Sequence, residues 1–275
     1  MRLEALVDEA EARVVLELAQ ARATIAQQAL EGRAKDARLA LLQADQESMT
    51  SLLVHDLRAP LASMRANLDW VKDELPKDFD AEVLEALAEA RQVTDRLAGM
   101  IGDLLNISRL EGGLMPLARD AQPCAAMVEA VHRQLLAPAH DRRVTVECEV
   151  EDVVLEADHG LLMRALENLA GSALRYTPSG GRLRLEAKRV GPELVFAVRH
   201  DGSPISAEVR ASLFEKYVQA GSTQDHRRAG WGLGLYFCKL CVDAHGGRLD
   251  VVDVEGWATS FEVRLPFNRV EEGER

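Results

Sequence analysis

The feature that most limits how this chain can fold is the spacing of apolar residues by alternating steps of four and three along its first 110 positions. Apolar residues from Val14 to Ile25 follow this spacing, and after Gly32 it resumes in a shifted frame. Such a repeat predicts a coiled coil whose frame slips once near the glycine. We therefore expect residues 1–49 to form a coiled-coil helix, either a plain dimerisation rod or a helix that transmits a signal by shifting its register.

The same spacing continues into two further predicted helices, separated by the loop "DELPKDFD" around Pro76. The second helix is expected from about Ala81 to Leu110, where the paired glycines of "EGGL" suit a helix C-terminus. Two antiparallel helices with one apolar stripe each make a poor core alone, but two such hairpins make a four-helix bundle. We therefore predict that residues 50–114 form a hairpin that pairs with a second copy as a homodimer.

Beyond a boundary near 115–122 the pattern changes to a mixture of helices and strands. Strands are expected at 143–150, 182–189, 193–199, 247–253 and 258–265, and helices at 125–136, 159–175 and 232–245. This mixture predicts an α+β fold in which a sheet packs beneath helices. We therefore expect a second domain over 120–269 and a short tail over 270–275.

The composition argues against several classes of function. The formal net charge of −12 makes non-specific binding of nucleic acid unfavourable. No apolar run approaches the roughly 20 residues of a membrane-spanning helix, and the acidic N-terminus lacks a signal-peptide core. We therefore expect a soluble, cytoplasmic protein without a membrane span. The C-x-x-C of Cys238 and Cys241 is interpreted as the packed face of a helix, because no second cysteine pair follows it.

The stretch "VHDLRAPL" at 54–61 places a histidine, an acid and a proline on the first helix of the hairpin. At about 100° per residue, His55 faces away from the apolar stripe and is expected to be exposed. Asp56 can orient the imidazole, which leaves the other ring nitrogen free to attack an electrophile. Pro60 removes the amide that would bond to the carbonyl of Asp56, so we predict a helix kink that gives this site freedom to bend.

This stretch resembles the H-box of sensor histidine kinases, in which the histidine is phosphorylated by ATP. The resemblance implies that His55 is the phosphoacceptor and that Asp56 is the general base in phosphoryl transfer. Many members have a threonine or asparagine four positions after the histidine, which supports dephosphorylation of the partner response regulator. The residue here is Ala59. Because its methyl group cannot orient a water, we expect weak or absent phosphatase activity by this route.

The resemblance extends over residues 50–267 and includes nucleotide-binding motifs. The block "RALENLAGSALRYTPSGG" is similar to the N-box of these kinases. By this resemblance Asn168 and Ser172 take the two polar positions associated with Mg²⁺. Arg175 fits the basic position that reaches the phosphates, and Tyr176 fits the aromatic position beside the adenine. Ser172 is a poorer Mg²⁺ ligand than the usual asparagine, although this ion takes much of its shell from waters and phosphates.

The stretch "VRHDGSPI" is similar to the G1 box, which reads D-x-G-x-G followed by an apolar residue. Anchored on Gly202, the alignment puts His200 where the family has the acid that accepts a hydrogen bond from the adenine amino group. It also puts Pro204 in place of the second glycine. A neutral imidazole nitrogen can accept that bond, or Asp201 can replace the acid through a shifted loop. Either acceptor is weaker than a carboxylate in register.

The stretch "GWGLGL" is similar to the G2 box, whose glycines let the backbone approach phosphates at the start of a helix. The stretch "LFEKYVQ" at 213–219 resembles the F-box, although an amphipathic helix end explains it equally, and the polar "STQDHRR" after it is expected to be a lid. The resemblance implies nucleotide contacts from the G2 box and the closing strand, namely Gly230, Gly232, Leu233, Gly234, Leu235 and Thr259.

These motifs predict a kinase core that autophosphorylates His55 with ATP and Mg²⁺ and passes the phosphoryl group to an aspartate on a separate response regulator receiver domain. The alternative is a degenerate kinase, changed at Ser172 and His200, that acts as a dimeric phosphotransfer or scaffold protein. The glycine-rich G2 box favours the kinase, because glycines there have little purpose without phosphates. A non-kinase ATPase with the same nucleotide fold leaves the His-Asp pair and the proline unexplained.

Overall fold

The computed structural model describes residues 27–28, 33, 38, 52, 54–76, 79–112, 116–218 and 232–267. Contacts divide the chain into two units, 1–53 and 54–275. The described positions of the first unit are all helical. The predicted coiled coil therefore lies almost entirely outside the described residues, and the predicted tail over 270–275 lies wholly outside them.

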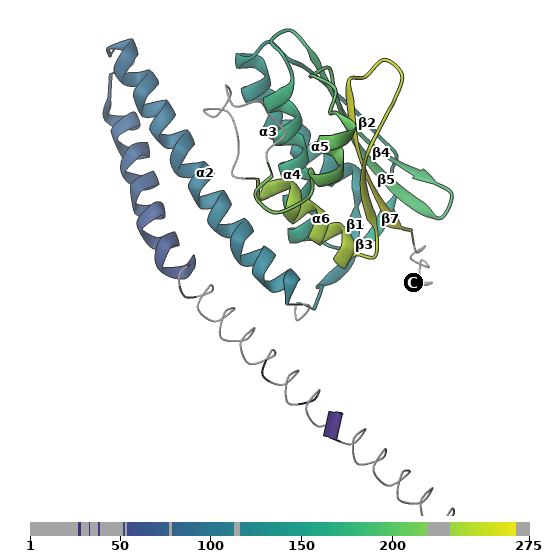
Figure 1. Ribbon diagram of the computed structural model, residues 1–275. Helices are drawn as coiled ribbons and strands as arrows, with labels where there is room; N and C mark the ends of the chain where they lie inside the picture. Colours follow the sequence, from purple (N-terminus) through teal and green to yellow (C-terminus); the bar gives the residue numbers. More distant parts are fainter. Residues whose placement is uncertain are drawn as a thin grey trace, which may run out of the picture. The chain divides into compact units, whose positions relative to one another are not determined.

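The second unit begins with a helical hairpin, formed by the segment 54–74 and by α2, Ala81–Glu111 (Figure 1). Asp80 caps the start of α2, because its side-chain oxygen accepts hydrogen bonds from the amides of Glu82 and Val83. Both helices of the hairpin are therefore where the apolar spacing predicts them. Their separation at "DELPKDFD" also agrees with the prediction.

Two ion pairs join the helices of the hairpin. Arg65 Nη1 lies 2.7 Å from the Asp95 carboxylate, and Arg91 pairs with Asp69. These side chains are partly open to solvent, so each pair contributes at most about 1 kcal/mol. The first helix keeps its helical backbone through Pro60, and a kink at this residue stays a prediction.

A five-stranded sheet with the order β2-β4-β5-β7-β6 follows the hairpin. β2 and β4 are parallel, and the remaining neighbours are antiparallel. The bounds lie within two residues of those predicted: β2 Thr145–Val150, β4 Arg182–Val190, β5 Glu193–His200, β6 Arg248–Val252 and β7 Thr259–Pro266. A second sheet, β1 Arg119–Pro123 with β3 Val154–Asp158, was not predicted, because the short "RDAQP" has no alternation of apolar residues.

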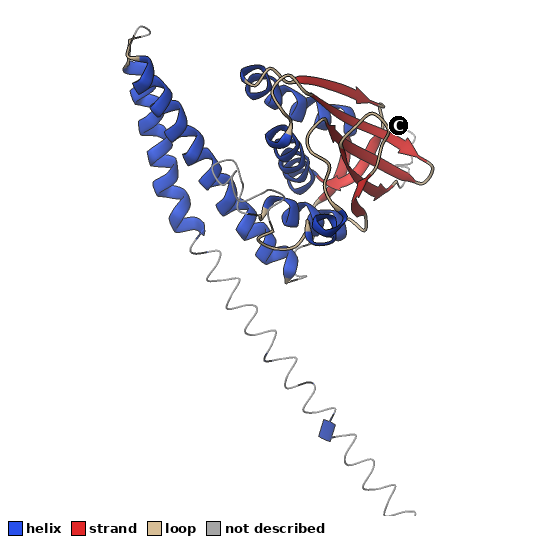
Figure 2. Ribbon diagram, turned by 45° about the horizontal axis from the view of Figure 1, so that its top comes forward, coloured by secondary structure: helices blue, strands red, loops and turns tan. Residues whose placement is uncertain are grey.

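Helices cover one face of the five-stranded sheet (Figure 2). They are α3 Cys124–Asp141, α4 His159–Tyr176 and α6 Gly234–Ala244, and the short α5 Ala207–Ser212 follows β5. The predicted end of α3 at 136 was wrong, because the helix continues through Pro138. This proline is exposed, so water can bond to the carbonyl that its ring frees. Among the described residues, no helix is both long and apolar enough to cross a bilayer.

The core of the domain lies between this sheet and its helices. Alternate residues of β5, namely Leu194, Phe196 and Val198, are buried in it, as expected for a strand with a period of two. The C-x-x-C cysteines on α6 are also fully buried there, and the thiols are free. Their interpretation as core packing is therefore confirmed. The α+β architecture expected from the sequence is present.

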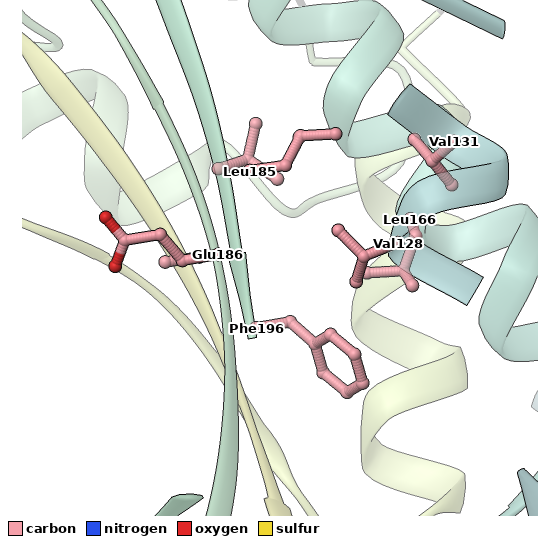
Figure 3. Close-up of a pocket in the computed structure, with 8 residues that line it drawn as sticks. Val128, Val131, Leu166, Leu185, Glu186 and Phe196 are labelled. Carbon is pink, nitrogen blue, oxygen red and sulfur yellow. The ribbon is translucent and has the colours of Figure 1, made fainter. Parts of the chain in front are cut away.

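A small cavity remains in this core between α3, α4 and the sheet (Figure 3). Its volume is about 10 Å³, which is roughly enough for one water molecule. In Figure 3 the carboxylate of Glu186 points away on the other face of the sheet. The cavity is therefore an apolar packing gap, far too small for a nucleotide. Its apolar lining is Val128, Val131, Leu166, Leu185, Phe196, Ala197 and Val198.

Candidate functional site

The histidine of the hairpin is open to solvent, as the helical spacing predicts. The side chain of His55 is 84% exposed and that of Asp56 is 78% exposed. The His55 Nδ1 lies 3.3 Å from the Asp56 carboxylate oxygen. When Nδ1 carries the proton and donates it to this carboxylate, the lone pair of Nε2 is directed to solvent. The pair is therefore arranged for attack by Nε2 on an incoming electrophile.

The predicted N-box residues lie on the last three turns of α4. Asn168, Ser172 and Tyr176 follow one another at intervals of four, so they share one side of the helix. Ser172 is only 4% exposed, whereas Asn168 and Tyr176 are half-buried and Arg175 is exposed. One side of α4 therefore presents an amide, a hydroxyl and a phenol at the edge of the core, with a cation beside them.

The amide of Asn168 is bonded to the hairpin. Its Nδ2 donates to Asp103 Oδ2 on α2 at 3.3 Å, and Arg164 Nε donates to the other oxygen of Asp103 at 2.8 Å. Asp103 is only 5% exposed. A buried carboxylate requires such partners, because its desolvation is costly. The hairpin and the predicted N-box are thus joined by a charged contact that the motifs did not predict.

A sequence signal for this contact exists. Met100, Asp103, Ile107 and Leu110 are spaced by three, four and three, and the three apolar members pack against the core of the mixed domain. They form a second stripe on α2, distinct from the one used to predict the hairpin. An acid within an apolar stripe indicates a buried partner elsewhere in the chain.

A second charged contact joins the end of α2 to the domain. The carboxylate of Glu111 accepts from Lys216 Nζ at 2.7 Å and from the Tyr236 hydroxyl at 2.6 Å. The hydrogen bond to Glu111 raises the pKa of Tyr236 to about 12. Lys216 lies just after α5 and Tyr236 lies on α6, so this contact touches two segments of the domain at once.

The described part of the G2 box enters α6 beside the N-box. Gly232 has φ of +71°, and a Cβ there would come within 2.6 Å of the Tyr217 backbone. Only glycine fits both the conformation and the space. At Gly234 an added Cβ would lie 3.4 Å from the side-chain amide of Asn168. Gly230 lies outside the described residues.

The start of α6 offers free backbone donors. Its N-cap is Leu233, and within the described residues no side chain caps this end of the helix. The first amides of a helix lack intrahelical partners and attract anions. The side chains of Leu233 and Leu235 pack into the core, so these two residues contribute backbone rather than side-chain groups to the site.

His200 lies at the end of β5 and is only 2% exposed. Its Nδ1 accepts a hydrogen bond from the amide of Gly202 at 3.0 Å. Burial lowers the pKa of His200 to about 4, although the nearby Asp201 opposes this shift. A Cβ at Gly202 would come within 2.5 Å of both His200 and the Tyr176 carbonyl oxygen, so a glycine is required there.

Asp201 has partners of its own. It forms an ion pair with Arg182, with Nε 3.0 Å from the carboxylate, and it accepts the Arg182 backbone amide at 3.1 Å. The Asp201 carboxylate is therefore already bonded to Arg182 on β4. The predicted role of Asp201 as a substitute for the G1 acid requires this pair to break.

Thr259 completes the group at this end of the sheet. It faces His200 in the register of β5 and β7, it is buried, and its hydroxyl donates to the Ser203 carbonyl at 3.3 Å. The G1 box, the end of α4 and the closing strand therefore converge. The two ends of the candidate site are thus the His200 corner and the Asn168–Gly234 contact.

No group of three or more His, Cys, Asp and Glu side chains in the described ranges has the arrangement of a metal site. The Asn168 amide lies beside Gly234, and the Ser172 hydroxyl lies one turn further along α4. Both are neutral hard ligands, which fit Mg²⁺ when phosphates and waters supply most of the shell. The residues present therefore fit a magnesium ion that arrives with a nucleotide rather than one held by protein alone.

Comparison with known families identifies both parts of the chain. Residues 45–113 match the His Kinase A (phospho-acceptor) domain, and residues 157–269 match the histidine kinase-, DNA gyrase B-, and HSP90-like ATPase family. The chain belongs to the histidine kinases. In this histidine kinase His55 and Asp56 lie in the phosphoacceptor domain, and the N-box, G1 and G2 residues lie in the ATP-binding domain.

Curated relatives are sensor proteins of bacteria. The chain is 31% identical over 216 residues to the alginate biosynthesis sensor protein KinB of Pseudomonas aeruginosa, covering 77% of this chain and 35% of KinB. It is 25% identical over 213 residues to the sensor protein SrrB of Staphylococcus aureus, covering 77% of this chain and 36% of SrrB. The histidine kinase chain thus spans about a third of the length of the relatives it matches.

Solved structures agree with the fold. Full-length ShkA in complex with AMPPNP superposes with a TM-score of 0.63 at 25% identity, covering 80% of this chain and 46% of ShkA. The Acinetobacter baumannii histidine kinase AdeS superposes with a TM-score of 0.54 at 20% identity, covering 78% of this chain and 98% of AdeS. A helical hairpin followed by an α/β sandwich is therefore the architecture of this histidine kinase.

Proposed function

We propose that this histidine kinase core autophosphorylates His55 with Mg-ATP and passes the phosphoryl group to an aspartate of a separate response regulator. The observation that carries the proposal is the exposed His55 with its Nδ1 on Asp56, within the matched phosphoacceptor domain. The same chain supplies the ATP-binding domain, so phosphoryl donor and acceptor are held together. Because both domains lie in one chain, the phosphoryl transfer does not depend on a bimolecular encounter between separate proteins.

The chemistry assigned to the pair is simple. The lone pair of His55 Nε2 attacks the γ-phosphorus of ATP, a P–N bond forms, and the P–O bond to ADP breaks. The ring would become cationic, and Asp56 takes up the proton of Nδ1 as charge develops. Transfer to an aspartate then breaks the P–N bond and forms an acyl phosphate.

The nucleotide is assigned to the corner between α4 and the start of α6. The free amides of α6 and the Arg175 guanidinium are suited to the phosphates. Asn168 and Ser172 would hold Mg²⁺, which neutralises phosphate charge when bound. Because Asn168 is bonded to Asp103 through Nδ2, its amide oxygen is the atom left to serve Mg²⁺, and the contact with the hairpin orients that oxygen.

The homodimer is inferred from an uncovered apolar face on the hairpin. Leu57, Met64, Val71, Val83 and Leu104 are between 36% and 51% exposed in the single chain. A contiguous apolar face of this kind favours a partner surface. A second hairpin would cover it as a four-helix bundle.

Incubation of the full chain with γ-labelled ATP and Mg²⁺ tests the proposal. We expect acid-labile label on the wild type and none on His55→Ala. The absence of label on a folded wild-type dimer would favour the scaffold alternative and contradict the kinase. ATP hydrolysis that persists unchanged in His55→Ala, without labelling of the wild type, would point instead to an ATPase.

A further inference from the structure

We propose that His200 acts as a hydrogen-bond donor to the purine base, so that this site binds 6-oxopurine nucleotides at least as well as ATP. The proposal rests on the proposed function, because it names the base selectivity of the same nucleotide site. It makes His200 a specificity-determining residue. The argument depends on where the ring lies, on which nitrogen carries its proton, and on which acceptors remain nearby.

The imidazole lies in the layer between the sheet and the helices. His200 continues the alternation of Phe196 and Val198 on β5, whose side chains face the helical layer. Its ring is nearly parallel to that of Phe261, with centroids 6.3 Å apart. It therefore extends the apolar layer to the end of the sheet, where the Tyr176 carbonyl closes against Gly202. The proposal places the base at this end of the sheet, against the imidazole.

The tautomer of His200 is determined by its neighbour. A backbone amide can only donate, so the 3.0 Å bond from Gly202 requires Nδ1 to be unprotonated. Burial keeps the ring neutral at ordinary pH, because the pKa of His200 is lowered to about 4. A neutral imidazole carries one ring proton, so this proton is on Nε2.

The Nε2–H group has no partner in the described part of the chain. The Gly202 amide is the one hydrogen-bond partner of the His200 ring there, and it occupies Nδ1. A buried donor without an acceptor is costly, at about 1–3 kcal/mol. An acceptor on a ligand satisfies this group.

The Nε2–H group of His200 donates a hydrogen bond, whereas the acid at this position in the family accepts one. The 6-amino group of adenine donates, so it opposes Nε2–H, whereas the 6-oxo group of guanine or hypoxanthine accepts from it. Asp201, the adjacent carboxylate, is held by Arg182 on β4 and leaves no acid in register. The substitution of histidine for the acid therefore reverses the hydrogen bond expected at the purine 6-position.

Binding of ATP and inosine triphosphate by the full chain tests the proposal, because these nucleotides differ only at the 6- and 1-positions of the base. Calorimetry with Mg²⁺ should give a Kd for inosine triphosphate equal to or lower than that for ATP. In His200→Asp we expect the order to reverse, with ATP favoured about tenfold, since a donor-acceptor match replaces a mismatch. His140→Asp is the control, because the His140 side chain on α3 is 91% exposed. In this variant the ratio of the two Kd values should equal that of the wild type.

The outcomes separate the two proposals. A wild type that binds ATP tenfold more tightly than inosine triphosphate overturns the donor role and leaves the kinase proposal standing. Failure to bind either nucleotide overturns both. If His200→Asp does not fold, the wild-type ratio still decides. His200→Asn, whose amide can donate or accept, should then bring the ratio near one.

Discussion

At the scale of single residues, the histidine kinase places its two important histidines in opposite environments. His55 is open to water beside an acid, whereas His200 is enclosed and bonded to the Gly202 amide. The first arrangement leaves a nucleophilic nitrogen available. The second holds the ring neutral. Each arrangement leads to a measurable consequence.

Asp56→Asn should slow autophosphorylation of His55 by about 10²–10⁴-fold, because a general base of this kind contributes that factor. Stability should hardly change, since the pair is highly exposed. Time courses with labelled ATP measure the rate, and Asp69→Asn on the same helix serves as a control. An unchanged rate in Asp56→Asn would remove the acid from the mechanism.

The buried His200 should make the protein less stable in acid. Its folded pKa of about 4 lies below the ordinary 6.5, so the unfolded chain binds the extra proton as the pH falls through 6.5. Stability from this group is full above pH 6.5 and is lost below it, by about 2 kcal/mol between pH 7 and 5. Urea unfolding at both pH values measures the loss. His200→Gln should show a smaller difference between the two pH values, whereas an unaltered difference would contradict the assignment.

At the scale of elements, α2 serves two partners. One stripe belongs to the hairpin, and the other, which contains Asp103, contacts the ATP-binding domain. The side chain that is expected to serve Mg²⁺ is therefore bonded to the hairpin in this structure. The helix contact takes Nδ2 of Asn168, and the oxygen of the same amide is left for the ion.

Asp103→Ala should therefore lower the affinity for Mg-ATP by about fivefold, since the hydrogen bond of about 1 kcal/mol that orients the Asn168 amide is lost. Thermal stability should fall at the same time, because Arg164 loses its partner. Calorimetry and unfolding curves measure the two effects. Asp95→Ala, a partly exposed acid on the same helix, is the matched control. Unchanged or higher affinity in Asp103→Ala would mean that the contact does not orient Asn168 for the nucleotide.

At the scale of the whole molecule, the apolar face of the hairpin predicts dimer formation. Met64→Glu places a charge on a side chain that is 51% exposed in the single chain, so it should cost the monomer little and disfavour the dimer. Sedimentation should show the variant shifted to monomer at concentrations where the wild type is a dimer. Lys72→Glu, also exposed, controls for the added charge. A monomeric wild type would contradict the bundle.

The sequence by itself determined the elements, because helix and strand periods are local properties. The four-three spacing located both hairpin helices, and alternation located the five strands within two residues. Two pieces escaped: β1 has no period to read, and the end of α3 contains Pro138, although Leu135 and Ala139 continue the helical spacing. The motifs predicted which residues belong to the candidate site, because the chemistry of a site depends on which functional groups are present.

Only the tertiary structure decided how those groups are used. The bond from Asn168 to Asp103 joins residues 65 positions apart, and although the apolar stripe around Asp103 indicates a buried partner, no local pattern specifies which residue it is. The tautomer of His200 depends on a backbone amide and on burial by several elements. Long-range contacts set the partners and the protonation of a side chain, and these determine whether an imidazole accepts or donates.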